Sequence, residues 1–195
     1  MARIEPLTAA ELEARGIDTA PFLAHFAELP GSIATLGYRP DILRATLGLW
    51  DAVMGQGRVP LELKYMAGYL ASMAAGCAYC SAHTASNAAA NGASSEKIEA
   101  IFDYENSPLF SEAERAALRF AELAGQSPSG VDDAEMVRLK LHYDDTQIVE
   151  LLAVVALYGF FNRWNDGLGT PLEATPRGFA TAHLGGHGWK IGKHG

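Results

Sequence analysis

The sequence predicts an all-helical protein. Apolar residues recur at three- and four-residue steps along the central stretch 61–87, which places them on one face of a helix. Helix-start signals recur as well, because Thr8 precedes Glu11, and Ser111 precedes Glu114, by three residues. The spacing and the capping signals together favour helices along most of the chain.

The first part of the chain, residues 1–58, is expected to form a helical arm. A capped short helix comes first, followed by a weak helix that ends at Pro30. A longer helix is expected over residues 42–54, where the apolar residues recur at helical spacing, and Gly55 ends it.

The centre of the chain is expected to form two helices in series. Pro60 suits the first turn of a helix, and the run that follows is rich in small and apolar residues and contains no proline. Gly76 is expected to close this helix, so that Cys77 opens the next one, which ends at Asn91.

The second half of the chain contains further helix patterns. The longest, 147–165, is apolar on almost every side and is therefore expected to be central or to lie at an interface. We expect a single domain over residues 1–195 with its core at about 59–170. The Gly- and His-rich tail 171–195 is expected to pack on the body or on a neighbouring subunit. The other expected helices cover residues 96–102, 111–124 and 133–141.

Composition and charge narrow the function classes. The 195 residues are 49% hydrophobic, and the net charge is −8 with no basic stripe, so nucleic-acid binding is not expected. The first residues are acidic and lack the apolar run of a signal peptide, and the longest apolar run, 151–161, is too short to span a bilayer. We therefore expect a cytoplasmic protein without a membrane partner. In the cytoplasm, a cysteine pair is more often catalytic than structural.

The two cysteines of the chain, Cys77 and Cys80, form a Cys-x-x-Cys pair, and His83 follows one helical turn later. A cysteine in the first turn of a helix lies near unpaired N–H groups and the positive end of the helix dipole, which favour its thiolate. His83 neighbours Cys80 on a helix and is placed to accept its proton. The pair is spaced for a cycle of thiolate attack, sulfenic acid and disulfide.

Three structural interpretations of the pair are weaker. Cysteines on an apolar stripe also serve as small buried hydrophobic residues. A disulfide between adjacent turns closes a tiny loop and stabilises little. A structural zinc site needs four ligands, and His142, His183 or His187 would have to supply them from distant parts of the chain, so no metal is expected.

The motif GCAYCSAHTASNAA at 76–89 resembles the signature of the alkylhydroperoxidase D and carboxymuconolactone decarboxylase superfamily. Members of its peroxidase-related branch read Cys-x-Tyr-Cys-x-x-His-Thr and later Phe-Asn-Arg-Trp-Asn-Asp, and this chain carries the second motif at 161–166. The resemblance to the superfamily core covers about residues 59–170, and the resemblance to the branch extends over most of the chain.

The resemblance implies an oligomeric helical bundle of the alkylhydroperoxidase D type that reduces hydroperoxides with the cysteine pair and without a cofactor. In that family the second cysteine attacks the peroxide, which implies Cys80 as the attacking residue, Cys77 as the resolving residue and an external dithiol as the reductant. The residues alone do not decide which cysteine attacks and which resolves. A helix N-terminus activates Cys77 more, whereas His83 lies nearer to Cys80.

Three family positions carry other residues here. The family histidine four residues after the second cysteine is replaced by Thr84, and the histidine just before that cysteine is replaced by Tyr79. The family glutamate about twelve residues before the first cysteine falls on Tyr65, and Glu62, one turn earlier, is a substitute on roughly the same face. Glu62 and Tyr79 are therefore candidates for a proton relay or for the pocket.

Glu150 is a third candidate, because it is a lone carboxylate in the apolar run of the last long helix. It is either an exposed acid that interacts with the helix dipole or a pocket residue, since the equivalent helix in the family packs near the cysteine site. The polar motif 162–166 at the other end of this helix is expected to form a polar network or a subunit contact rather than to catalyse.

The leading functional prediction is a thiol-dependent peroxidase. His83, with Glu62 or Glu150 acting through water, would deprotonate Cys80 and help to protonate the leaving alkoxide. Two alternatives stay open. One is a lyase or isomerase of the carboxymuconolactone decarboxylase kind, which needs no cysteine pair. The other is a non-enzymatic assembly protein whose cysteines sense oxidation.

Overall fold

The protein is all-helical, as the sequence predicts. The computed structural model describes residues 2–26 and 28–195, and no β-strand occurs within these ranges. The α-helices are, in chain order, α1 (Ala9–Glu13), α2 (Ala20–Phe26), α3 (Gly31–Leu36), α4 (Pro40–Met54), α5 (Leu61–Ala74), α6 (Ala78–Ala90), α7 (Ser95–Glu99), α8 (Glu112–Gly125), α9 (Asp133–Lys140), α10 (Asp145–Leu168) and α11 (Ala174–His183). Short 3₁₀ turns cover Ala100–Asp103, Gly185–His187 and Gly192–His194.

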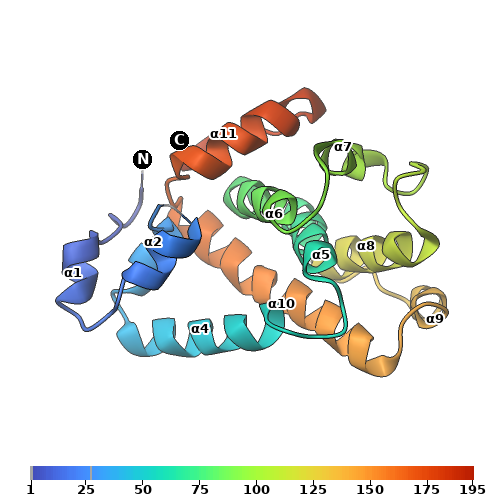
Figure 1. Ribbon diagram of the computed structural model, residues 1–195, viewed down its shortest axis with the longest axis horizontal. Helices are drawn as coiled ribbons and strands as arrows, with labels where there is room; N and C mark the ends of the chain where they lie inside the picture. The colour runs from blue at the N-terminus through green and yellow to red at the C-terminus, as the bar shows by residue number, and fades with distance from the viewer. Residues whose placement is uncertain (1, 27) are drawn as a thin grey trace.

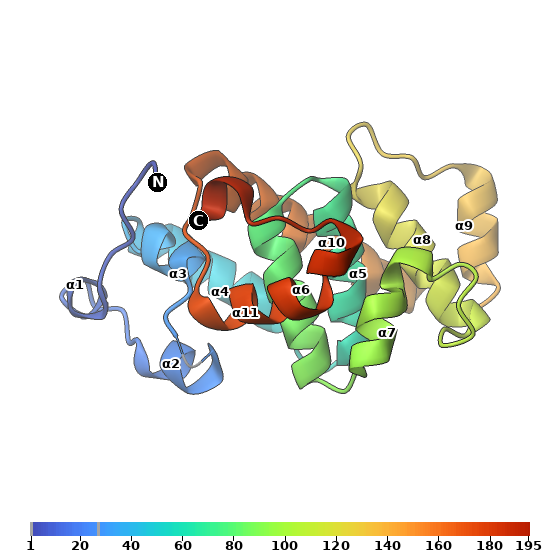
Figure 2. The same cartoon turned by 90° about the horizontal axis from the view of Figure 1, so that it is seen from above.

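The long helix α10 runs through the molecule and contacts both of its ends. Helices α1–α4 lie at one end and α7–α9 at the other (Figures 1 and 2). Helices α5 and α6 pack on each other and on α10, and α11 covers α6. Leu151, Val154 and Leu157 of α10 are almost completely buried in the core that these helices share. The site described below lies where α6 and α10 meet the N-terminal helices.

Side-chain caps explain where several helices begin. The Thr8 and Ser111 hydroxyls each accept a hydrogen bond from the backbone N–H of the glutamate three positions later. The carboxylate of that glutamate accepts one from the backbone N–H of the cap residue, so both expected capping boxes form. Asp144 caps α10 in the same way with Gln147. These contacts pair donors that a helix start otherwise leaves unpaired.

Two elements differ from the prediction. Helix α3, which the sequence did not predict, begins at Gly31, directly after the expected break at Pro30. A glycine at this position leaves room for Thr170 and Glu173, because a Cβ atom there would lie 2.7 Å from the Thr170 methyl group. Residues 174–183 form α11, whose stability as a helix comes from packing on α6 rather than from a strong helix pattern of its own.

Within residues 2–26 and 28–195, no helix is both long enough and apolar enough to cross a bilayer.

Candidate active site

A glycine turn between α5 and α6 sets the position of the cysteine pair. Gly76 has a φ of +73°, a conformation that favours glycine, and it separates the end of α5 from the start of α6. Cys77 is the N-cap of α6, and its sulfur accepts a hydrogen bond from the Cys80 backbone N–H at 3.4 Å. The expected break at Gly76 and the expected position of Cys77 are both confirmed. Both cysteines are free thiols and almost completely buried.

The surroundings of the two sulfur atoms shift their pKa values in opposite directions. The Cys80 thiol donates to the Cys77 sulfur and, with His194 and the Cys80 N–H, lowers the pKa of Cys77 to about 6 against the opposing effect of burial. Burial and the neighbouring Cys77 thiolate raise the pKa of Cys80 well above its ordinary value, although Asn165 donates to its sulfur at 3.5 Å. These opposite directions favour the thiolate form at Cys77 over the thiolate form at Cys80.

A largely apolar pocket of about 270 Å³ reaches the second cysteine of the pair. Cys80 and His83 line it, whereas Cys77 is not among its lining residues. Aromatic rings form much of the wall: Trp50 packs edge-on against Phe161 with ring centres 5.7 Å apart. The pocket thus presents one sulfur to a small apolar or aromatic molecule and keeps the other behind it.

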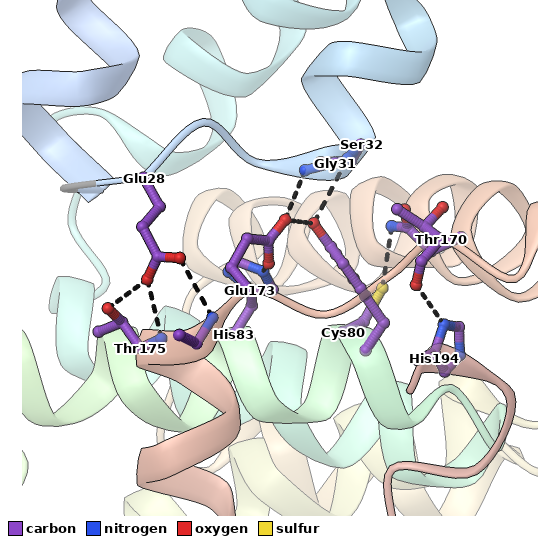
Figure 3. A network of polar contacts seen from close by, with 12 residues as sticks. Glu28, Gly31, Ser32, Cys80, His83, Thr170, Glu173, Thr175 and His194 are labelled. Atoms are coloured by element: carbon purple, nitrogen blue, oxygen red, sulfur yellow. Dashed lines mark hydrogen bonds and ion pairs between the residues drawn. The ribbon is translucent and has the colours of Figure 1, made fainter. Parts of the chain in front are cut away.

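Glu173 holds the polar side of the pocket together (Figure 3). Its carboxylate pairs with the His83 ring nitrogen Nε2 at 2.7 Å and accepts from the Tyr79 hydroxyl at 2.8 Å. The Gly31 N–H also donates to it, and the Ser32 N–H donates to the Tyr79 oxygen at 3.3 Å. Residues far apart in the sequence therefore meet at Glu173.

The charges of this network are fixed by burial and by hydrogen bonds. Burial disfavours the Glu173 carboxylate, but the hydrogen bond and charge of His83 and the Gly31 N–H outweigh it and lower the pKa of Glu173. Burial and the Glu173 carboxylate raise the pKa of Tyr79 well above its ordinary value, so Tyr79 is a neutral donor. Glu173 is the anion that orients His83.

Sequence reasoning missed Glu173. It lies 90 residues after His83 and precedes a helix that the sequence did not predict. A second carboxylate, Glu28, accepts from the Ala174 and Thr175 N–H groups at 3.1 and 2.8 Å and so anchors the start of α11. No local pattern around Glu173 distinguishes it from a surface acid, so only the tertiary fold reveals its role.

The structure does not bring Glu62 to the cysteine pair. Glu62 binds the Lys97 Nζ at 3.2 Å, in a cluster with Glu114 near the start of α5. Cys77 lies just beyond the other end of that helix, which rises about 18 Å over the twelve residue steps from Glu62 to Ala74. The structure thus places Glu62 in an ion pair with Lys97 and places Glu173 beside His83.

Glu150 is also distant from the pair. Its carboxylate accepts from the N–H groups of Arg58 and Val59 at 2.9 and 3.0 Å and lies 3.6 Å from the buried Lys64 Nζ. Asn165, which contacts Cys80, is fifteen residues further along α10, or about 22 Å. Glu150 is thus neither an exposed acid nor a pocket residue. Its carboxylate instead fixes the loop between α4 and α5.

Within the described residues, no group of three or more His, Cys, Asp and Glu side chains is arranged to hold a metal ion.

Known proteins with related sequences place these features in context. Residues 40–123 match the carboxymuconolactone decarboxylase family. The protein YnjA of Escherichia coli K12 is 37% identical over 101 residues, which is 52% of this chain. This match covers 56% of YnjA, so the chain aligns with little more than half of that relative.

Solved structures extend the likeness over most of the chain. The debrominase Bmp8 is 33% identical, with a TM-score of 0.80 over 89% of this chain and 94% of its own. A cysteine-to-alanine variant of Bmp8 in complex with 2,3,4-tribromopyrrole gives a TM-score of 0.82 at 32% identity over 91% of this chain and 95% of its own. A peroxidase-related protein of Ralstonia eutropha JMP134 with an alkylhydroperoxidase AhpD core is 21% identical, with a TM-score of 0.78 over 92% of this chain and 95% of its own, and shares the fold.

Proposed function

We propose that this chain, which belongs to the alkylhydroperoxidase D and carboxymuconolactone decarboxylase superfamily, is a dithiol-dependent reductase of small organic hydroperoxides. One observation carries the proposal: Cys80 lines an apolar pocket, while its hydrogen-bonded partner Cys77 lies outside that lining. A substrate in the pocket would therefore meet one sulfur first, and the second sulfur would be in reach for resolution.

The first proposed step moves one proton and breaks the O–O bond. The Cys77 thiolate takes the Cys80 proton, and the Cys80 sulfur attacks the terminal peroxide oxygen. Cys80 becomes a sulfenic acid, and the alkoxide leaves. This assigns the role of base to Cys77, because His83 Nε2 is already engaged by Glu173.

The second step closes the cycle. The Cys77 sulfur attacks the Cys80 sulfenic sulfur, and hydroxide leaves and takes a proton to form water, with a disulfide between the two residues. An external dithiol then reduces the disulfide by thiol–disulfide exchange and is itself oxidised to a disulfide.

His83 is proposed to protonate the leaving alkoxide. It borders the apolar pocket and also lines an adjoining hollow of about 230 Å³ that Glu28, Ser86 and Glu173 share. After donating a proton to the alkoxide, the imidazole would regain one from this polar hollow. General acids of this kind contribute about a hundredfold or more to a rate.

Turnover of cumene hydroperoxide with a dithiol reductant tests the proposal. Cys80→Ser should abolish turnover, and Cys77→Ser should consume about one equivalent of peroxide and then stop. His83→Gln should lower turnover by about ten- to a hundredfold. The matched control His183→Gln, which changes the more exposed histidine paired with Glu99, should leave turnover unchanged.

Full turnover by Cys80→Ser would refute this assignment. Oxidation of the wild-type thiols without turnover would instead favour the redox-sensing alternative.

Reductive dehalogenation of a small aromatic halide is a second candidate. The aromatic pocket wall formed by Phe22, Trp50 and Phe161, and the likeness to the debrominase Bmp8, favour it. The net reaction uses the same two electrons: an aryl bromide and the dithiol give the debrominated arene, the disulfide and hydrogen bromide. Release of bromide from a brominated pyrrole, absent in Cys80→Ser, would support this activity.

A lyase or isomerase acting on an acidic lactone has less support. No lysine or arginine is found among the pocket-lining residues of the described chain, and the histidine there, His83, is already paired with Glu173, so an anionic substrate would lack a free cationic partner.

We also propose a homo-oligomer built from a single-domain chain. Val149, Leu152 and Phe160 are exposed on α10, where they recur near helical spacing. Light scattering coupled to size-exclusion chromatography would test this, and a monomer at micromolar concentration would contradict it.

A further inference from the structure

The last turn of α10 places a buried amide against the cysteine pair. The Gly169 and Thr170 N–H groups both donate to the Asn165 carbonyl, and Gly169 adopts the left-handed conformation that ends the helix. This turn fixes the backbone of Asn165, which is only 1% exposed and lines the apolar pocket together with Cys80. The motif 161–166, expected to form a polar network, thus reaches the sulfur that faces the pocket.

The Asn165 amide is aimed at that sulfur. Its nitrogen Nδ2 donates to the Cys80 sulfur at 3.5 Å, a contact that Figure 3 draws as the dashed line ending on the sulfur. Its oxygen Oδ1 is buried and has no hydrogen-bond partner within residues 2–26 and 28–195. Burying an amide is costly unless hydrogen bonds compensate. No side-chain contact of Asn165 in this part of the chain other than the one with the sulfur explains why an amide is buried here.

A second buried asparagine of α10 lacks such a contact. Asn162 lies one turn before Asn165 and is 2% exposed, and neither its side-chain nitrogen nor its side-chain oxygen has a partner among the described residues. The two asparagines therefore share a helix and a degree of burial, and they differ in the contact with Cys80.

The other groups near the Cys80 sulfur oppose a negative charge on it. Burial, the Cys77 sulfur and the Asp166 carboxylate each raise the pKa of Cys80, whereas the hydrogen bond from Asn165 lowers it. Lys193 offsets part of the Asp166 charge by pairing with it at 2.8 Å. Burial raises the pKa of Tyr158 on the same helix, so its phenol stays neutral. A thiolate at Cys80 therefore depends on the Asn165 donor.

We propose that Asn165 is a further catalytic residue, whose amide stabilises the negative charge that the Cys80 sulfur carries when it attacks. The proposal rests on the function proposed above, in which the Cys80 proton passes to Cys77 before the O–O bond breaks. The electron pair left on sulfur accepts the Asn165 N–H and then forms the S–O bond, while the O–O electron pair leaves with the alkoxide. An amide suits this position because it is a fixed donor that carries no charge of its own.

The test is the alkylation rate of Cys80 in Cys77→Ser, where Cys80 is the single remaining thiol. Iodoacetamide, a small neutral reagent, reacts with the thiolate. Asn165→Leu removes the donor and keeps the approximate size of the side chain. At mildly alkaline pH it should lower the rate about ten- to a hundredfold, because the pKa of Cys80 rises by about one to two units. The matched control Asn162→Leu should leave the rate unchanged.

An unchanged rate in folded Asn165→Leu, or an equal fall in both leucine variants, would overturn the proposal. If Asn165→Leu does not fold, the side-chain amide proton resonances of wild type and Cys80→Ala decide the matter. Loss of the sulfur should move the Asn165 resonances upfield and leave those of Asn162 in place, and unmoved Asn165 resonances would overturn the proposal. Neither measurement uses a peroxide, so failed turnover would refute the proposed function without affecting this test.

Discussion

At the scale of single residues, two histidine–glutamate pairs show how burial changes the effect of an ion pair. His83 and Glu173 are 2.7 Å apart with side chains 17% and 10% exposed. His183 and Glu99 are 2.8 Å apart, and the Glu99 side chain is 48% exposed. The first pair is screened less by solvent and also holds Tyr79 and Gly31, so it should matter more for stability.

Glu173→Gln should lower the free energy of unfolding at neutral pH by about 2 kcal/mol, because His83 loses its buried anion. The wild-type pKa of Glu173 is lowered below 4.5 in the folded state, so its stabilising effect is present above that pH and is lost as the pH falls through the folded pKa. The difference between wild type and variant should therefore shrink on acidification. Urea unfolding at neutral and acidic pH measures both effects.

Glu99→Gln is the matched control for this experiment, and it should change stability little at either pH. Equal losses in the two variants would contradict the special role assigned to the buried pair.

At the scale of secondary-structure elements, the break between α5 and α6 positions both cysteines. The break needs a residue with positive φ, and Gly76 supplies it with open space around the position of a Cβ atom. Any cost of a side chain at Gly76 is therefore conformational rather than steric.

Gly76→Ala should destabilise the protein by about 1–2 kcal/mol, because alanine disfavours the left-handed conformation. Gly178→Ala in α11 is the matched control: its Cβ atom also meets open space, but its backbone is helical. That change should stabilise by about 0.5–1 kcal/mol. Thermal unfolding of both variants measures the contrast, and the same sign for both would refute this account.

Glu150 fixes the loop between α4 and α5 and neutralises Lys64, whose side chain is 1% exposed. Glu150→Ala should lower the free energy of unfolding by about 3 kcal/mol, because a buried ammonium loses its carboxylate partner. Lys64→Met should cost less, because it removes the buried charge itself. The rate of thiol oxidation per folded molecule should be unchanged in Glu150→Ala, and a large loss of that rate would return Glu150 to the relay.

At the scale of the whole molecule, local signals in the sequence predicted most of the helices and the cysteine pair. Capping at Thr8 and Ser111, the break at Gly76 and the position of Cys77 depend on residues within a few positions of one another. The family, identified from two motifs, is supported by the comparisons. The assignment of Cys80 as the attacking residue stays a prediction.

The partners of the cysteines and of His83 could not be predicted in this way. Glu173 reaches the site from the end of the chain, just before α11, which packs against α6. The sequence suggests Glu62 from its place on the helix face and Glu150 as a lone carboxylate in an apolar run, but each forms an ion pair with a lysine elsewhere. Charge partners that meet only through tertiary packing leave no periodic signal in the sequence.

The most direct test of the central claim is to locate the first oxidised sulfur. Reduced Cys77→Ser is mixed with one equivalent of cumene hydroperoxide and dimedone, a reagent that captures sulfenic acids, and its peptides are analysed by mass spectrometry. The account predicts a dimedone adduct on Cys80, formed more slowly than wild type loses its thiols, because the Cys77 base is absent. Unmodified Cys80 with the peroxide unconsumed, while Cys80→Ser forms an adduct on Cys77, would contradict it.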